Sequence, residues 1–421
     1  MPTSKSFASS VLILLGGTSV ALAVPLVASP FLSHIYTPEM FGQMAVFVSA
    51  VSIGAIAATG RYELAIPIPK SNITALGVAV VACMSAGFIA VLASVGLAFL
   101  SLSAPKLLGS ALSTTVWVVA VPICIMMLAC IQILTYWQSR RQAFGVVAEA
   151  RASQAIAMTG GQLGAGLLGL GDIGLIGGYI IGAAVSLWRL TRSGWNDLQV
   201  NSARLHRRWL FAAAKRFANM PKFLVIGHLA NVVSSQLPVI MLATLYGSRE
   251  AGLYAFAERM TLIPCAVVAN SVGEVFRQSA AQIFQREGNC LDLFLKTKLR
   301  LSILAFVFAL AIVTAAPTAF SLMFGDAWNE AGQLAVSLGI IAFFQTVSSP
   351  LSQTVYLSSE YRGDLAWQLV RLLLSAAGIY VGFILFADFK TSVFFHSIIF
   401  ALAYMLHSVM QYQVARGGRK L

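Results

Sequence analysis

The sequence predicts an all-α membrane protein of about twelve transmembrane helices, arranged as two six-helix halves with both termini in the cytoplasm. Three observations predict this class. Hydrophobic residues make up 58% of the 421 residues and charged residues only 10%, whereas soluble domains carry about 25% charged residues. Long apolar runs recur along the whole chain, and the basic residues fall between these runs on alternate loops.

Twelve runs are long enough to cross a bilayer. A helix rises about 1.5 Å per residue and needs about 20 residues for a hydrocarbon core of about 30 Å. Helices are expected because backbone groups in lipid must pair internally and the runs are too long for barrel strands. The predicted spans are 8–32, 40–60, 75–100, 111–136, 150–170, 173–190, 222–246, 251–272, 297–318, 331–357, 364–387 and 391–414.

The first run begins like a signal peptide, with Lys5 followed by apolar residues. It continues through residues 20–27 without a clear cleavage site. We therefore expect an uncleaved first span.

The basic residues fix the predicted orientation. All but four of the 28 lysines and arginines fall on one side of the twelve spans. Lys106, Arg249 and Lys390 fall on the other side, and Arg259 lies inside a span. Because basic loops stay in the cytoplasm, the heavily basic side is predicted to be cytoplasmic.

The net charge of +13 raises the question of nucleic-acid binding. The charges follow the cytoplasmic loops, and aromatic residues are not interleaved with them in a loop-borne domain. Anionic lipid headgroups are the expected counter-charge. We therefore expect membrane lipids as partners and no nucleic acid.

The longest polar stretch lies at mid-chain and predicts the domain organisation. Residues 1–190 form an N-terminal six-helix bundle, 191–221 a cytoplasmic linker with an amphipathic helix, and 222–421 a C-terminal six-helix bundle. A short motif supports a duplication, because YTPEMFGQMA from Tyr36 is matched by YGSREAGLYA from Tyr246. Chance similarity between apolar segments is the alternative.

Two charges lie inside the predicted span 251–272. Arg259 is about 12 Å along that helix, where a charge costs about 2.5–3.5 kcal/mol. Such a side chain is expected to face a protein interior or the water-filled cavity of a transporter. Glu258 precedes it and points about 100° away, so the two are not expected to pair with each other. A buried structural network is the alternative.

Arg61 and Glu63 end the second span, just before Pro67, Pro69 and the interfacial Lys70. They predict a charge gate at the cytoplasmic mouth of a cavity, or alternatively an interfacial anchor with a local ion pair. Arg151 lies at the start of the fifth span, where a solvated charge is the simpler interpretation.

The seventh span has a polar face in its first half and centre. Pro238 can bend this helix and leaves a carbonyl without its helical partner. The face suits a moving helix of a transporter, with helix packing as the alternative. Its polar residues are His228, Asn231, Ser234, Ser235 and Gln236.

The sequence shows no catalytic constellation, so we expect no enzyme. It has no paired carboxylates on an outer loop, no P-loop and no nucleophile elbow. The five cysteines lack metal-ligand spacing and are expected to be small buried residues, so no metal site is predicted. Without a nucleotide site or cofactor, energy must come from an H⁺ or Na⁺ gradient or from the substrate gradient.

Several stretches together resemble one family. They include YTPEMFGQ, RYELAIPIPKS, PKFLVIGHLANVVSSQLPVIM and AGLYAFAERMTLIPCAVVANSVGEVFRQ. They resemble the bacterial polysaccharide-export flippases of the multidrug/oligosaccharidyl-lipid/polysaccharide (MOP) exporter superfamily. The resemblance implies two pseudo-symmetric six-helix bundles around a V-shaped central cavity that opens alternately to each side.

The resemblance also implies the substrate, a polyprenyl-diphosphate-linked oligosaccharide crossing the bacterial inner membrane. An O-antigen repeat unit of lipopolysaccharide or an exopolysaccharide repeat unit fits, with other polysaccharide-assembly proteins as candidate partners. Arginines would form charge-assisted bonds to the diphosphate. The candidate substrate-binding residues are Arg61, Glu63, Arg151, Asn231, Gln236, Glu258 and Arg259.

Two other functions fit the composition. An ion-coupled multidrug exporter of the same superfamily predicts a cavity dominated by acidic residues, yet the chain has only 15 aspartates and glutamates. A membrane polymerase or ligase of surface glycans usually needs acidic residues on a sizeable outer loop, and the predicted outer loops are short.

Overall fold

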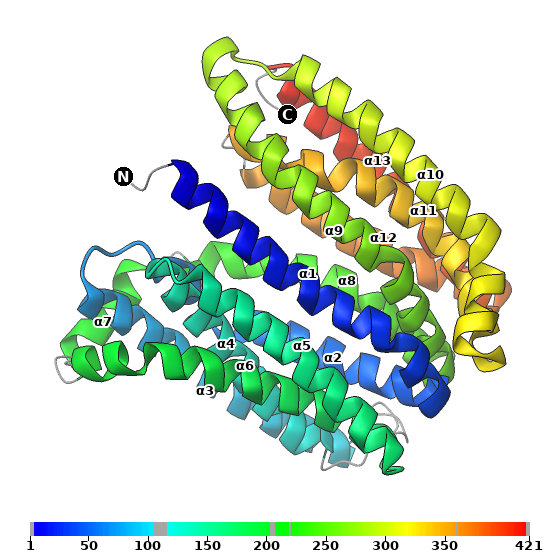
Figure 1. Ribbon diagram of the computed structural model, residues 1–421, viewed down its shortest axis with the longest axis horizontal. Helices are drawn as coiled ribbons and strands as arrows, with labels where there is room; N and C mark the ends of the chain where they lie inside the picture. The colour runs from blue at the N-terminus through cyan, green and yellow to red at the C-terminus, as the bar shows by residue number, and fades with distance from the viewer. Residues whose placement is uncertain (1–3, 104–115, 203–206, 219, 359–360, 418–421) are drawn as a thin grey trace. The chain divides into compact units, whose positions relative to one another are not determined.

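The computed structural model describes residues 4–103, 116–202, 207–218, 220–358 and 361–417, and all regular structure within these ranges is helical (Figure 1). The chain divides into two compact units. Unit 1 comprises Met1–Tyr36 and Gln43–Val232, and unit 2 comprises Thr37–Gly42 and Val233–Leu421. The predicted all-α fold class is confirmed.

The described residues of the first half of the chain form seven α-helices. In unit 1, α5 packs along both α1 and α6, and α3 packs against α4 (Figure 1). A core around Phe47, Val51, Cys124 and Ile125 joins α2 to α4. The helices are α1 (Ser4–Ile35), α2 (Pro38–Ala58), α3 (Asn72–Ser103), α4 (Val121–Arg140), α5 (Phe144–Leu167), α6 (Gly171–Ser202) and α7 (Arg207–Arg216).

Six α-helices come from the part of the second half that the structure describes. In unit 2, α11 contacts α9, α10 and α13, and α12 packs along α13. A core around Phe276, Phe294, Leu301 and Leu351 joins α9, α10 and α11. The helices are α8 (Val225–Leu245), α9 (Ser248–Glu287), α10 (Leu291–Phe324), α11 (Asn329–Leu351), α12 (Tyr361–Phe386) and α13 (Phe389–Ala415).

In the part of the chain that the structure describes, eleven helices are long and apolar enough to span a membrane. The remaining predicted span, 150–170, falls on α5. This helix has 24 residues and a length of about 36 Å, which is sufficient to cross the core. It is less apolar than the other spans because its sequence includes Glu149, Arg151, glutamines and several glycines.

Glycines allow α5 and α6 to approach closely. A Cβ at Gly178 would lie 2.5 Å from Gln162 Cγ, and one at Gly182 would lie 2.7 Å from Met158 Cβ. Small residues bring helix backbones together in membranes, where packing rather than the hydrophobic effect drives association. The glycines of α6 therefore seat α5, with Gly161 of α5 facing Gly178.

Three predicted spans were clearly too short. The spans 173–190, 251–272 and 297–318 lie within α6, α9 and α10, which have 32, 40 and 34 residues. Hydropathy marks the lipid-embedded part of a helix only, whereas backbone hydrogen bonding continues into water. In α9 the extension carries the ion pair of Glu274 with Arg277 and ends at Gly288, whose φ of 72° an L-residue rarely adopts.

The predicted amphipathic helix of the linker is present as α7. It packs against α3, with Ala213 buried in a cluster that contains Leu76 and Trp137. Phe211 lies on the opposite, exposed side. The position of α7 at a membrane surface and the cytoplasmic location of both termini stay predictions.

The two copies of the repeated motif meet within unit 2. A Cβ at Gly42 would lie 1.8 Å from the carbonyl oxygen of Ser248, and a Cβ at Gly252 would lie 1.8 Å from that of Pro38. The contact is reciprocal, because each glycine faces the first helical residue of the other motif. Only glycine fits at such a distance.

The tyrosines that open the two motifs have matching surroundings. Tyr36 lies beside Gly166 and Gly174, at the facing ends of α5 and α6. Tyr246 lies beside Phe383 and Phe389, at the facing ends of α12 and α13. Each tyrosine therefore contacts the fifth and sixth spans of its own half, which supports the interpretation of a duplicated chain.

Candidate functional site

A sharp turn after α2 positions the first predicted pair. Gly60 and Arg61 have φ values of 57° and 58°, in the left-handed region that favours glycine. Arg61 is a non-glycine residue held there, which is a mark of functional or strained positions. A 3₁₀ turn of Tyr62–Ala65 follows and places Glu63 against Arg61. Burial raises the pKa of the neighbouring Tyr62 phenol, whose hydroxyl donates to the Ala214 carbonyl.

Arg61 and Glu63 form a buried ion pair. Arg61 Nη1 lies 3.0 Å from Glu63 Oε1, with 9% and 0% of the side chains exposed. Arg61 Nη2 also lies 3.1 Å from His228 Nδ1 of α8. The predicted local pair is therefore confirmed as a contact, and the charge of Arg61 is balanced within unit 1.

Tyr136 of α4 lies within electrostatic range of three charges, those of Arg61, Glu63 and Arg151. Arg151 Nη1 donates to Thr18 Oγ1 at 2.9 Å. Three of the predicted binding residues, from α5 and the turn after α2, therefore form a charge cluster around one phenol, in which Arg61 and Glu63 are the pair in direct contact.

Glu149 does not belong to this cluster. Its carboxylate pairs with Arg189 of α6. Among the described residues Arg151 therefore has no carboxylate partner, and its charge is less balanced than that of Arg61.

Glu258 and Arg259 lie in unit 2 on α9. Both side chains are half-buried. The Tyr254 hydroxyl lies 3.5 Å from Glu258 Oε1, and the Tyr254 ring contacts the ring of His396. Within the described ranges the ion pairs of α9 involve Arg249 and Arg277, and none includes Arg259. That Glu258 and Arg259 do not pair with each other stays a prediction.

The polar face of α8 is used in part for packing. Pro238 cannot donate to the carbonyl of Ser234, four residues earlier. The Ser375 hydroxyl of α12 donates to that carbonyl at 3.0 Å. His396 Nδ1 lies 3.2 Å from the Ser375 carbonyl in turn. Asn231 and Gln236, the two predicted binding residues of this helix, are half-buried.

Sequence reasoning missed Tyr136 and did not link His228 to Arg61. Tyr136 stands in the apolar run of α4, one turn before Arg140, and no feature of the sequence distinguishes it from an interfacial tyrosine. His228 was visible as a polar residue of its span. Its contact with Arg61 depends on packing across 167 positions of the chain.

The thiols and metal-binding side chains give no further site. Cys124, Cys265 and Cys290 are buried and Cys83 and Cys130 half-buried, as predicted for small packing residues. Over the residues that the structure describes, no three His, Cys, Asp or Glu side chains gather as metal ligands.

Sequence comparisons place the chain among polysaccharide biosynthesis proteins. A family model described as polysaccharide biosynthesis protein matches residues 31–333. The succinoglycan biosynthesis transport protein ExoT of Rhizobium meliloti (strain 1021) is 28% identical over 159 residues. That match covers 37% of this chain and 31% of the relative's own length.

Solved structures show the same fold at low identity. The lipid II flippase MurJ in an inward closed conformation has a TM-score of 0.68 at 12% identity, over 96% of this chain and 90% of that one. An inward-facing multidrug resistance MATE family transporter has a TM-score of 0.63 at 11% identity, over 95% and 96%. A MOP superfamily transporter from Pyrococcus furiosus has a TM-score of 0.57 at 12% identity, over 97% of this chain and 94% of that one.

The chain has the fold of MOP superfamily transporters, and its apolar helices indicate a multi-pass membrane protein. The predicted twelve-helix, two-bundle layout agrees with these relatives. Within that class, the chain belongs to the polysaccharide biosynthesis protein family.

Proposed function

We propose that this protein is a flippase that moves a polyprenyl-diphosphate-linked oligosaccharide across the bacterial inner membrane by alternating access. An O-antigen or exopolysaccharide repeat unit is the proposed cargo. The family membership supports a glycan substrate. The relative named for succinoglycan biosynthesis transport and the solved structure named as a lipid II flippase are consistent with it.

One structural observation carries the substrate proposal. Arg259 is a half-buried arginine on a membrane-spanning helix, and no carboxylate among the described residues neutralises it. A diphosphate supplies the missing negative charge and matches the guanidinium fork. Arg151, hydrogen-bonded to Thr18 only through a neutral hydroxyl, is the second proposed diphosphate ligand.

The remaining predicted residues take supporting roles in this proposal. Arg61 is already balanced by Glu63, so the pair acts as a gate rather than as the main anion ligand. Asn231 and Gln236 are proposed to bond sugar hydroxyls, for which amide side chains have both donors and acceptors. Glu258, beside the Tyr254 hydroxyl, is the proposed position of a coupling proton.

The test compares two arginines of the same helix. Arg259→Ala is expected to abolish export of surface polysaccharide while the protein remains in the membrane, and Arg259→Lys to retain part of it. Arg277→Ala is the matched control, because Arg277 lies on the extension of α9 and pairs with Glu274 in water. Unchanged export in the Arg259→Ala strain would exclude the proposed role.

The MATE-like fold favours testing a multidrug exporter alongside. A deletion strain with altered drug susceptibility and normal surface glycan would support that function. Accumulation of lipid-linked repeat units on the cytoplasmic face would support the flippase and the proposal that the protein is not an enzyme. Single repeat units accumulating on the periplasmic face would instead support a polymerase or ligase.

A further inference from the structure

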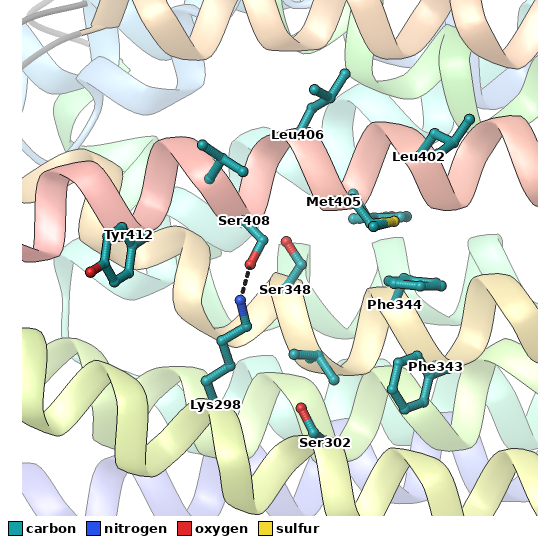
Figure 2. Close-up of a pocket in the computed structure, with 13 residues that line it drawn as sticks. Lys298, Ser302, Phe343, Phe344, Ser348, Leu402, Met405, Leu406, Ser408 and Tyr412 are labelled. Atoms are coloured by element: carbon teal, nitrogen blue, oxygen red, sulfur yellow. Dashed lines mark hydrogen bonds between the residues drawn. The ribbon is translucent and has the colours of Figure 1, made fainter.

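A pocket of about 730 Å³ lies in unit 2 between α10, α11 and α13 (Figure 2). Its volume is within the roughly 300–1,000 Å³ of small-molecule sites. Phe343, Phe344, Leu402 and Met405 line one end, as Figure 2 shows. None of the proposed substrate-binding residues contributes to it.

A lysine marks the other end. Lys298 Nζ lies 2.8 Å from Ser408 Oγ and sits 5.9 Å from the centre of the Phe294 ring. Within the described part of the chain no carboxylate pairs with Lys298. Lys296, two residues earlier, is exposed and pairs with Asp292 at 2.7 Å. The pocket therefore presents an uncompensated cation beside a long apolar surface.

The dimensions match one leaflet of a bilayer. Along α13 the lining extends from Leu402 to Tyr412, about 15 Å, which is half of a hydrocarbon core of about 30 Å. The 34 residues of α10 span about 51 Å, so about 10 Å project beyond the core at each end. Lys298 is about 10 Å from the start of α10, at headgroup depth.

The helices around the pocket are accessible to lipid. Of the eleven candidate spans in the described residues, α10 has the smallest buried share, 17%. On α13, Leu402, Leu406 and Val409 are more than half exposed. On the predicted orientation, the cationic end faces the cytoplasmic leaflet, which carries the anionic lipids.

We propose that this pocket binds one anionic glycerophospholipid of the cytoplasmic leaflet. The lipid phosphate lies at Lys298 and Ser408, and one acyl chain lies along Phe343, Phe344 and Met405. Basic pockets between transmembrane helices on the cytoplasmic side suit anionic headgroups. This lipid site is separate from the proposed substrate-binding residues, so the proposal does not depend on which substrate the protein transports.

Native mass spectrometry of the purified full chain tests this site. The probes are phosphatidylglycerol and phosphatidylcholine with identical oleoyl chains. Lys298→Gln is expected to weaken phosphatidylglycerol binding about fivefold, the effect of one lysine near an anionic surface, and to leave phosphatidylcholine binding unchanged. Lys296→Gln, the matched control, is expected to behave as the wild type.

A second variant tests the apolar end without changing charge. Met405→Trp places a larger ring in the pocket and is expected to weaken binding of both lipids. Unchanged phosphatidylglycerol binding in either Lys298→Gln or Met405→Trp would overturn the proposal, as would an equal loss in Lys296→Gln. Binding of undecaprenyl phosphate that depends on Lys298, with none of phosphatidylglycerol, would also overturn it.

Discussion

Arg61 reaches Glu63 only because its backbone adopts a left-handed conformation, so that two residues two positions apart form a buried ion pair of 3.0 Å. A buried pair is weak support for stability, because desolvation offsets attraction. Breaking one is costly, because it leaves a charge without its partner. We therefore expect the stability of the protein to fall when either member of the pair is removed, and to change little when both are replaced by apolar residues.

Arg61→Ala is expected to destabilise the protein by roughly 3–5 kcal/mol, because Glu63 stays buried without its cation. The double variant Arg61→Met with Glu63→Leu is expected to recover most of that loss. Thermal unfolding of detergent-purified protein measures both. An Arg61→Ala protein that unfolds at the wild-type temperature would contradict the geometry. Polysaccharide export by the stable double variant then distinguishes the two roles of the pair. Export should be lost if the pair is a charge gate and retained if it is an interfacial anchor.

Gly42→Ala is expected to destabilise unit 2 by at least about 1–3 kcal/mol, the usual cost of overpacking. Its new methyl group would lie 1.8 Å from the Ser248 carbonyl oxygen, a backbone atom that no side-chain rotation moves. Gly87→Ala is the matched control, because nothing lies within 4 Å of a Cβ there. The unfolding temperature should fall for Gly42→Ala and should stay the same or rise for Gly87→Ala. The reverse order would refute the contact between Gly42 and Ser248.

Ser375→Ala is expected to cost about 1–3 kcal/mol, because the buried Ser234 carbonyl loses its donor. Pro238→Ala supplies a backbone N–H to the same carbonyl. The Ser375→Ala change should therefore cost less in a Pro238→Ala background. A double-mutant cycle on unfolding free energies measures the coupling. Equal costs in the two backgrounds would show that the hydroxyl and the proline act separately.

Asp388→Ala is expected to cost about 0.5–2 kcal/mol at neutral pH, because Asp388 caps α13 by accepting from the Thr391 backbone N–H at 2.8 Å. Asp388→Asn should keep most of the cap. Asp388 is largely exposed, so the low end of this range is expected.

The pH dependence of that cap has a definite sign. Hydrogen bonds from the Thr391 hydroxyl and backbone hold the pKa of the Asp388 carboxyl below its ordinary value. The charge contribution is present above about pH 3.9 and is lost as pH falls through the lower folded value. The gap between wild type and Asp388→Asn should therefore close in acid; a gap that widens there would contradict the cap.

Local patterns in the sequence were sufficient for the helices and for contacts between near neighbours. Arg61 and Glu63 follow a helix end two residues apart, and Glu258 and Arg259 are adjacent on one helix, so their relations follow from chain geometry. The carbonyl freed by Pro238 follows from the chemistry of proline. The donor to that carbonyl does not, because Ser375 comes from another helix.

Packing between distant helices was not predictable from one sequence. Arg151 comes within electrostatic range of the same phenol as the Arg61 pair because of how α4, α5 and the turn after α2 pack, and periodicity does not encode that packing. Hydropathy also failed at the ends of α6, α9 and α10, because a helix can continue beyond its apolar segment. At α5 it underestimated a span that glycines of α6 hold in place by close packing.

The reciprocal seating of Gly42 on Ser248 and of Gly252 on Pro38 limits how the two copies of the motif can diverge. A bulkier residue or an inserted residue in one copy collides with the main chain of the other, and only a simultaneous change in both relieves it. The two segments are therefore bound to coevolve. Length variation among related proteins should accumulate in other loops and leave these two corners unaltered.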